Sequence, residues 1–193
     1  MFGGTRAPTD VTVVLLGKIS NNKCLVGNTI FQKDHFRSER VRCEKIVDNV
    51  GGEKVCIINT PDLFHKPKLA QPGPDVYLLV MQLGRFTEGE REVLPHLKRE
   101  FGQDVTLKTL ILFTGKEKLK NRTLTDYISG SDTELQELIK TCHARCHAFN
   151  NNKEKSSHQV KKLLDLISDM QENSAIASHH GHRKKHEKEC SIL

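Results

Sequence analysis

A short apolar run followed by a glycine is the feature that most limits what this chain can fold into. Residues 11–16 read VTVVLL, a β-branched and aliphatic run typical of a strand that is buried on both faces of a parallel sheet. Gly17 follows this run, and residues from about 23 to 31 favour a helix. A strand, a glycine turn and a helix in this order make the first unit of a doubly wound α/β fold.

The rest of the chain continues the same alternation of strands and helices. Further strands are predicted at residues 43–47, 55–58, 76–82, 107–113 and 146–149, and helices at 88–101, 133–142 and 160–170. Gly51 and Gly52 favour a hairpin turn between the second and third strands. We therefore expect an N-terminal extension at residues 1–10, one α/β domain at 11–172 and a flexible His- and Lys-rich tail at 173–193.

Composition limits the classes of partner. The chain of 193 residues carries a net charge of +6, which is compatible with nucleic acid or an anionic membrane as a partner. It has no tryptophan and only 5% aromatic residues, so no nucleic-acid partner is expected, because single-stranded nucleic acids bind on aromatic stacking platforms. No secretory leader opens the sequence and no apolar run approaches a membrane span, so the six cysteines are expected to be reduced thiols in a cytoplasmic protein.

The loop after the first strand partly matches a phosphate-binding loop, whose pattern is G-x-x-x-x-G-K-S/T. Gly17 and Lys23 stand at the required spacing, Asn22 replaces the second glycine and Cys24 replaces the hydroxyl residue. Asparagine tolerates unusual backbone angles, but sulfur is a poor ligand for Mg²⁺. The nucleotide-binding candidates here are Gly17, Lys18, Ser20, Asn21, Asn22, Lys23 and Cys24. The alternative is that these residues only close the turn from strand to helix, with Lys23 in solvent.

Other segments strengthen the nucleotide-binding interpretation. Residues 27–30 read GNTI, residues 59–64 read NTPDLF, and a PGP turn at 72–74 is followed by QLGRFTE at 82–88. On these segments, and on residues 112–114, 135–139 and 147–151, the chain resembles the GIMAP family of immunity-associated GTPases over roughly residues 11–170, most closely its fish-type members. The resemblance implies a P-loop GTPase-like, doubly wound and mostly parallel sheet flanked by helices. It also implies GTP or GDP as ligand and adds Lys116, Glu117 and Asn150 to the nucleotide-binding candidates.

The departures from the family pattern fall on residues that handle metal, phosphate and base. Asn59 stands where the family has its magnesium-side aspartate, and Asp62 replaces the glycine that senses the γ-phosphate. Arg40 replaces the switch threonine, and Lys118 replaces the carboxylate that reads guanine. Lysine accepts no hydrogen bond, so Glu117 would have to take this role through a shift of one residue. Mg²⁺ is therefore a poor fit, and no catalytic residue or protein metal site is assigned.

The switch region is also shortened. Only residues 65–71 separate the NTPDLF segment at 59–64 from the PGP turn at 72–74, where family members place a helix. Seven residues that include Pro67 cannot hold a normal helix with its loops. In the family this helix contributes to the nucleotide response and to self-association, so a conventional two-state switch is not expected.

The last four residues, Cys190 to Leu193, match the C-a-a-X pattern, and leucine in the last position favours a geranylgeranyl lipid on Cys190. The basic residues that precede it would supply the second signal for an anionic membrane surface; they are Arg183, Lys184, Lys185 and Lys188. This predicts anchoring to the cytosolic face of an intracellular membrane. The alternative is an unmodified terminus.

Three functions remain open at this point. The first is a GTP-binding protein with weakened or lost hydrolysis that is tethered to a membrane. The second is a pseudo-GTPase that binds no nucleotide and serves as an interaction module, by self-association or by pairing with related GTPases. The third is a working GTPase with atypical ligands.

Overall fold

The computed structural model describes residues 11–18, 22–37, 43–61, 73–151 and 156–189, with the backbone alone at residues 156 and 175–189. The strands are β1 (Val11–Leu16), β2 (Glu44–Val50), β3 (Glu53–Asn59), β4 (Val76–Gln82), β5 (Thr109–Thr114) and β6 (Cys146–Phe149). The α-helices are α1 (Lys23–Phe31), α2 (Glu88–Arg91), α3 (Val93–Phe101), α4 (Leu124–Ser129), α5 (Thr133–Thr141) and α6 (Ser156–Glu189). Two 3-10 helices, η2 (Gln103–Lys108) and η3 (Lys116–Leu119), precede and follow β5.

The six strands form one sheet in the order β2-β3-β1-β4-β5-β6. All neighbouring strands are parallel except β2 and β3, which form the antiparallel hairpin predicted around Gly51 and Gly52. The central strand β1 aligns Leu15 with Asn59 of β3 and Leu16 with Leu79 of β4. The predicted mostly parallel, doubly wound sheet is therefore confirmed.

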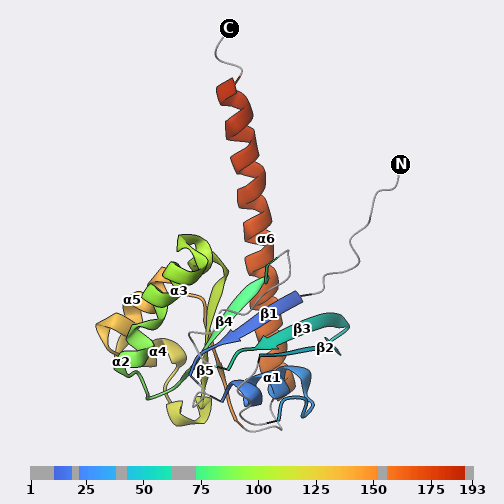
Figure 1. Cartoon of the computed structure of the whole chain (residues 1–193). Coiled ribbons are helices and arrows are strands. Elements are labelled where there is room, and N and C mark those ends of the chain that lie inside the picture. The colour runs from blue at the N-terminus through green and yellow to red at the C-terminus, as the bar shows by residue number, and fades with distance from the viewer. Residues whose placement is uncertain (1–10, 19–21, 38–42, 62–72, 152–155, 190–193) are drawn as a thin grey trace.

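Alternate residues of the central strand β1 pack into two separate hydrophobic clusters, one on each face of the sheet. Val13 and Leu15 pack in the cluster that includes residues of α1 and α6. Val14 and Leu16 pack in the cluster that includes residues of α3 and α5. Figure 1 shows the same division, with α1 and α6 on one side of the sheet and α2 to α5 on the other. Because strand side chains alternate between faces, an uninterrupted apolar run is needed to serve both clusters.

Some predicted boundaries differ from the structure. The helix predicted at residues 88–101 is two helices, α2 and α3, which meet at Glu92. Pro95 lies in the first turn of α3, where its missing N–H removes no helical hydrogen bond. The strand predicted from residue 107 begins at Thr109, because the two residues before it belong to η2. The short helix α4 was not predicted; none of its residues is fully buried, although Leu124, Tyr127 and Ile128 are partly buried against the cluster that includes α3 and α5.

The last helix is much longer than the sequence indicated. α6 extends to Glu189 and so includes residues 173–189, for which the sequence predicted a flexible tail and no helix. Among the side chains that are described, up to residue 174, its apolar buried residues are Val160, Leu163, Ile167 and Met170. The later turns leave the domain, as Figure 1 shows. Within the described part of the chain, no helix has both the length and the apolar character needed to cross a membrane.

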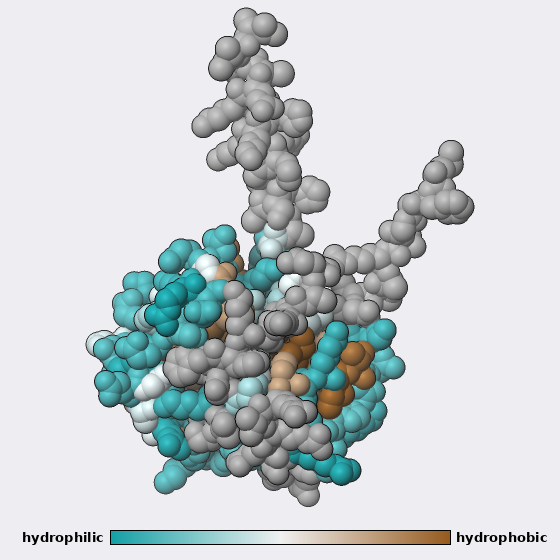
Figure 2. Space-filling view, viewed as in Figure 1, coloured by the Kyte–Doolittle hydropathy of each residue, from teal (hydrophilic) through white to brown (hydrophobic). Residues whose placement is uncertain are grey.

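The surface is mostly hydrophilic. Figure 2 shows a largely hydrophilic face, with apolar side chains exposed beside the β2–β3 hairpin. Among large apolar residues in the described ranges, Val47 on β2 is 46% exposed and Leu107 in η2 is 51% exposed. These two residues lie on different elements and form no common patch.

Candidate functional site

The glycine after β1 is held by a close backbone approach. Gly17 has a φ of +140°, and a Cβ atom added there would lie 2.5 Å from the carbonyl oxygen of Val80 on the neighbouring strand β4. Any larger residue would therefore collide with backbone and strain its own dihedral angles. The chain turns at this point from the carboxyl end of β1 toward α1, at the edge of the sheet where ligands of doubly wound proteins bind.

The other end of the turn closes back onto Gly17. Asn22 adopts a left-handed conformation with a φ of 61°, so the prediction that asparagine can hold the turn in place of glycine is confirmed. Lys23 begins α1 and is only 4% exposed, and its Nζ donates a hydrogen bond to the carbonyl oxygen of Gly17. The alternative in which Lys23 extends into solvent is therefore wrong.

The metal-side residues of the predicted site meet beside this turn. Nδ2 of Asn59, the last residue of β3, donates a hydrogen bond to Sγ of Cys24 over 3.3 Å. Asn59 is 8% exposed, and its Oδ1 is buried and has no hydrogen-bond partner among the described residues. This pair offers a thiol and a neutral amide where Mg²⁺ requires hard oxygen ligands, so the residues do not fit Mg²⁺. No three His, Cys, Asp or Glu side chains of the described ranges cluster as a metal site.

Lys18 is directed away from the turn. Its Nζ lies 3.0 Å from Oε2 of Glu90 and donates a second hydrogen bond to Oγ1 of Thr87 over 2.7 Å. Glu90 is 2% exposed, and its Oε2 also accepts a hydrogen bond from the backbone N–H of Thr87. Burial raises the pKa of Glu90, but the hydrogen bonds from Thr87 and Lys18 outweigh it and lower the pKa below its ordinary value. The structure thus gives Lys18, a predicted nucleotide ligand, a partner on α2.

The predicted base-reading segments lie next to each other. Oε1 and Oε2 of Glu117 accept hydrogen bonds from Nδ2 and the backbone N–H of Asn151, over 3.1 and 3.3 Å. The backbone N–H of Asn150 donates to Oε1 of Gln159 on α6. Lys118 is directed elsewhere, because its Nζ donates to the carbonyl oxygen of Leu83 over 3.5 Å. The exposed residues Lys116 and Glu117 follow β5, so Glu117 and the segment of Asn150 and Asn151 are brought together.

Some sequence predictions fall outside the described residues. They are Ser20 and Asn21 of the phosphate loop, Arg40, Asp62, the shortened segment at residues 65–71 and the lipidation candidate Cys190. Of the predicted phosphate-loop residues, Gly17, Asn22, Lys23 and Cys24 are described and lie around one turn, whereas Lys18 leaves it.

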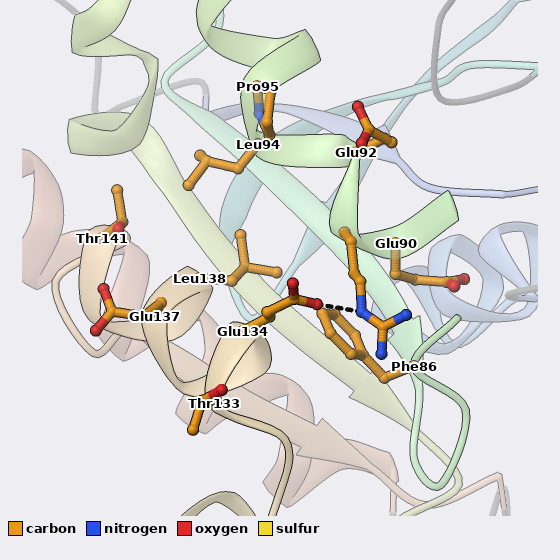
Figure 3. Close-up of a pocket in the computed structure, with 11 residues that line it drawn as sticks. Phe86, Glu90, Glu92, Leu94, Pro95, Thr133, Glu134, Glu137, Leu138 and Thr141 are labelled. Atoms are coloured by element: carbon orange, nitrogen blue, oxygen red, sulfur yellow. Dashed lines mark ion pairs between the residues drawn. The ribbon is translucent and has the colours of Figure 1, made fainter. Parts of the chain in front are cut away.

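A hollow that was not predicted from the sequence lies between α2, α3 and α5 and has a volume of about 310 Å³. Its apolar side chains include Phe86, Leu94 and Leu138, and Glu134 forms an ion pair with Arg91 at its edge (Figure 3). Arg91 also stacks over the ring of Phe86, with its Cζ 5.5 Å from the ring centre. The only signal for this hollow is the GRFTE segment itself, which carries Phe86 and leads into α2.

Comparison with known proteins places this geometry in a family. A profile of the AIG1 family matches residues 11–192. The chain is 28% identical over 190 residues to GTPase IMAP family member 8 of Mus musculus, covering 84% of this chain and 28% of that protein. It is 32% identical over 184 residues to immune-associated nucleotide-binding protein 9 of Arabidopsis thaliana, covering 81% and 54%. The chain therefore spans between about a quarter and about a half of these relatives.

Solved structures show the same fold. Toc33 of Arabidopsis thaliana, in a crystal structure with GDP and Mg²⁺, superimposes with a TM-score of 0.64 at 19% identity over 85% of each chain. That likeness concerns the fold, and the profile match over nearly the whole chain decides the family. With its phosphate-loop remnant at the carboxyl end of β1, the chain belongs to the AIG1 family.

Proposed function

We propose that this chain is a guanine-nucleotide-binding protein of the AIG1 family whose hydrolysis is weakened or lost. The observation that carries the proposal is the buried Lys23, whose ammonium closes the turn between β1 and α1 on the carbonyl of Gly17. A buried ammonium with backbone N–H groups of a helix start beside it is suited to phosphate oxygens. A bound phosphate would accept the hydrogen bond of the Lys23 ammonium in place of the Gly17 carbonyl oxygen.

The base end of the site supports guanine over adenine. Glu117 already presents both carboxylate oxygens as acceptors to the N–H groups of Asn151. A guanine edge offers N1–H and N2–H₂ donors of the same kind, whereas adenine has no donor at N1. Glu117 can therefore fill the acceptor role that Lys118 cannot.

The same geometry argues against efficient hydrolysis. Phosphoryl transfer needs a metal ion, a placed water and preorganised charge. Cys24 and Asn59 remove the hydroxyl and the carboxylate on the metal side, and the sequence places Asp62 where a glycine N–H would meet the γ-phosphate. Binding without rapid turnover follows from a site that keeps its lysine but has lost these oxygen ligands.

Calorimetric titration of the full chain with GDP, GTP and ADP tests the proposal. We expect GDP and GTP to bind in the micromolar range or tighter, with ADP at least about tenfold weaker because adenine has no N1–H donor to pair with Glu117. Lys23→Met, which keeps an unbranched buried side chain, should abolish binding, whereas the exposed Lys120→Met should not.

The outcomes separate the three functions. No heat from any nucleotide at high micromolar concentration would rule out the proposal and favour an interaction module that binds no nucleotide. The internal hydrogen bonds of Lys18, Lys23 and Lys118 are the observation that favours this second candidate. Binding accompanied by sustained phosphate release would instead indicate a working GTPase with atypical ligands.

Membrane attachment through Cys190 is part of the proposal and rests on the sequence of the last residues. Expression of the chain in a eukaryotic host should give an intact mass raised by a geranylgeranyl group and lowered by loss of the last three residues. The variant Cys190→Ser should keep its full, unmodified mass. An unmodified mass of the unaltered chain would rule out the anchor and leave nucleotide binding untouched.

A further inference from the structure

We propose that the metal position beside the phosphate loop takes a thiophilic divalent cation, of the class of Zn²⁺ and Cd²⁺, held between Cys24 and the phosphates of a bound nucleotide. This inference rests on the proposed nucleotide binding and names the cation class that would accompany the nucleotide. It starts from the misfit between Mg²⁺ and the Cys24–Asn59 pair.

The first observation is the position of the thiol. Cys24 is the second residue of α1, directly after Lys23, and stands where the phosphate-loop pattern requires the metal-binding hydroxyl. Cys24 is half-buried and packs against the edge of the cluster that includes α1 and α6. Nδ2 of Asn59 donates a hydrogen bond to this sulfur, which fixes its direction.

The second observation is an unused acceptor on the same amide. Oδ1 of Asn59 is buried and has no donor in the described structure, and the residue is only 8% exposed. A buried acceptor is normally paired, and an unpaired one indicates an absent water, ion or ligand. Because Nδ2 of this carboxamide reaches Cys24, the oxygen bonded to the same carbon lies beside the thiol. A metal-bound water would supply the missing donor.

Cys24 and Asn59 together carry the same charge as the family's hydroxyl and aspartate when the thiol of Cys24 has lost its proton. The family pattern pairs a neutral hydroxyl with an aspartate, and this chain pairs a thiol with a neutral amide. When a cation binds, the thiol releases its proton to solvent and the negative charge stands at residue 24 instead of residue 59. Thiolate ligands select Zn²⁺ and Cd²⁺, whereas Mg²⁺ requires oxygen ligands.

The test measures GDP affinity by calorimetry with a chelator alone, with Mg²⁺ and with Cd²⁺. For the unaltered chain, Cd²⁺ should tighten GDP binding by about tenfold or more, and Mg²⁺ by less than about threefold. The double variant Cys24→Ser/Asn59→Asp restores the family's oxygen ligands and should reverse this order. Cys43→Ser, at an exposed cysteine outside the site, is the matched control and should behave as the unaltered chain.

A second readout reports the bond itself. Thiolate-to-cadmium charge transfer absorbs in the ultraviolet, and the band should grow when GDP is added to the unaltered chain with Cd²⁺ and not when it is added to Cys24→Ser. Equal tightening of GDP by Mg²⁺ and Cd²⁺ in the unaltered chain, or a GDP-dependent band that survives in Cys24→Ser, would overturn the inference. Those results leave nucleotide binding standing, whereas absence of GDP binding under every condition would remove both proposals.

Discussion

Lys18 and Glu90 form an ion pair of 3.0 Å across 72 residues of sequence. Lys18 belongs to the turn after β1, and Glu90 is the third residue of α2, where it also completes a capping box with Thr87. The carboxylate is buried and the ammonium is one-third exposed. The pair therefore ties the phosphate-loop turn to the helix start that borders the hollow of Figure 3.

Removing the charge of Glu90 should destabilise the domain at neutral pH and make its free energy of unfolding less dependent on pH in the acid range. Glu90→Gln leaves Lys18 without its carboxylate, and we expect a loss of about 1–3 kcal/mol in the free energy of unfolding at neutral pH. The folded-state pKa of Glu90 is lowered, so its contribution is present above the ordinary glutamate pKa and is lost as pH falls below it. Urea denaturation between pH 7 and pH 3 measures both effects.

Glu88→Gln is the control for this experiment, because Glu88 is exposed in the same turn of α2 and no hydrogen bond from Lys18 reaches it in the described structure. It should change stability by less than about 0.5 kcal/mol. Equal effects of the two substitutions would show that the Lys18–Glu90 pair contributes nothing specific.

Gly17→Ala should be among the most damaging single substitutions. The added methyl would collide with the carbonyl oxygen of Val80, and backbone on both sides would have to shift. We expect a loss of about 2–4 kcal/mol by chemical denaturation. Gly73→Ala, where a Cβ meets open space at an ordinary φ, should be neutral or slightly stabilising. A Gly17→Ala protein of full stability would contradict the close approach.

Substitutions at Asn22 should separate backbone strain from side-chain chemistry. The left-handed φ of 61° costs alanine about 1 kcal/mol, so Asn22→Ala should lower stability by that amount. Asn22→Gly, which restores the second glycine of the phosphate-loop pattern, should stay within about 0.5 kcal/mol of the unaltered chain. Thermal denaturation measures both, and a harmless Asn22→Ala would show that the turn relaxes.

Restoring the base-reading carboxylate should raise guanine affinity. Lys118 accepts no hydrogen bond and its ammonium reaches the carbonyl of Leu83 instead. Lys118→Asp should tighten GDP binding about tenfold and leave ADP binding unchanged. Lys120→Asp makes the same charge change on the same loop and should alter GDP affinity by less than about twofold. Parallel gains in the two variants would indicate a general electrostatic effect.

The buried thiol of Cys142 should make stability fall at high pH. Burial raises its pKa from 9.0 to about 11, with small opposing effects of Arg145 and Lys98. The folded state holds this proton more tightly, so the contribution is complete below pH 9 and is lost as pH rises to about 11. Between pH 9 and pH 11, the free energy of unfolding measured by denaturation should fall more steeply for the unaltered chain than for Cys142→Ala. Superimposable profiles would contradict the shift.

Elements with strong local patterns could be predicted from the sequence. The apolar runs at β1, β4 and β5 predict buried parallel strands because each must serve two helical layers. The apolar stripe that predicted α6, by contrast, ended at Met170. Only a helix that packs against the core needs apolar residues at regular spacing. The later turns of that helix bury no described side chain and therefore had no periodic signal.

The candidate site could be predicted only as a set of residues. The pattern identified Gly17, Lys23, Cys24 and Asn59 as members, and the structure brings them to one corner. It could not assign Lys18 to Glu90, because that contact depends on how the turn after β1 meets the start of α2, 72 residues away in sequence. Nor could the sequence show that Oδ1 of Asn59 is buried without a donor, since that requires all of its neighbours.

The length of α6 bears on the proposed lipid at Cys190. Residues 171–189 continue the helix beyond Met170, the last buried residue among its described side chains, and at about 1.5 Å per residue they span roughly 30 Å. Charges in water are screened over about 8 Å at physiological ionic strength. A domain carried on such a spacer would be electrically insulated from the headgroups beneath it, so its affinity for nucleotide would not depend on the lipid composition of the membrane.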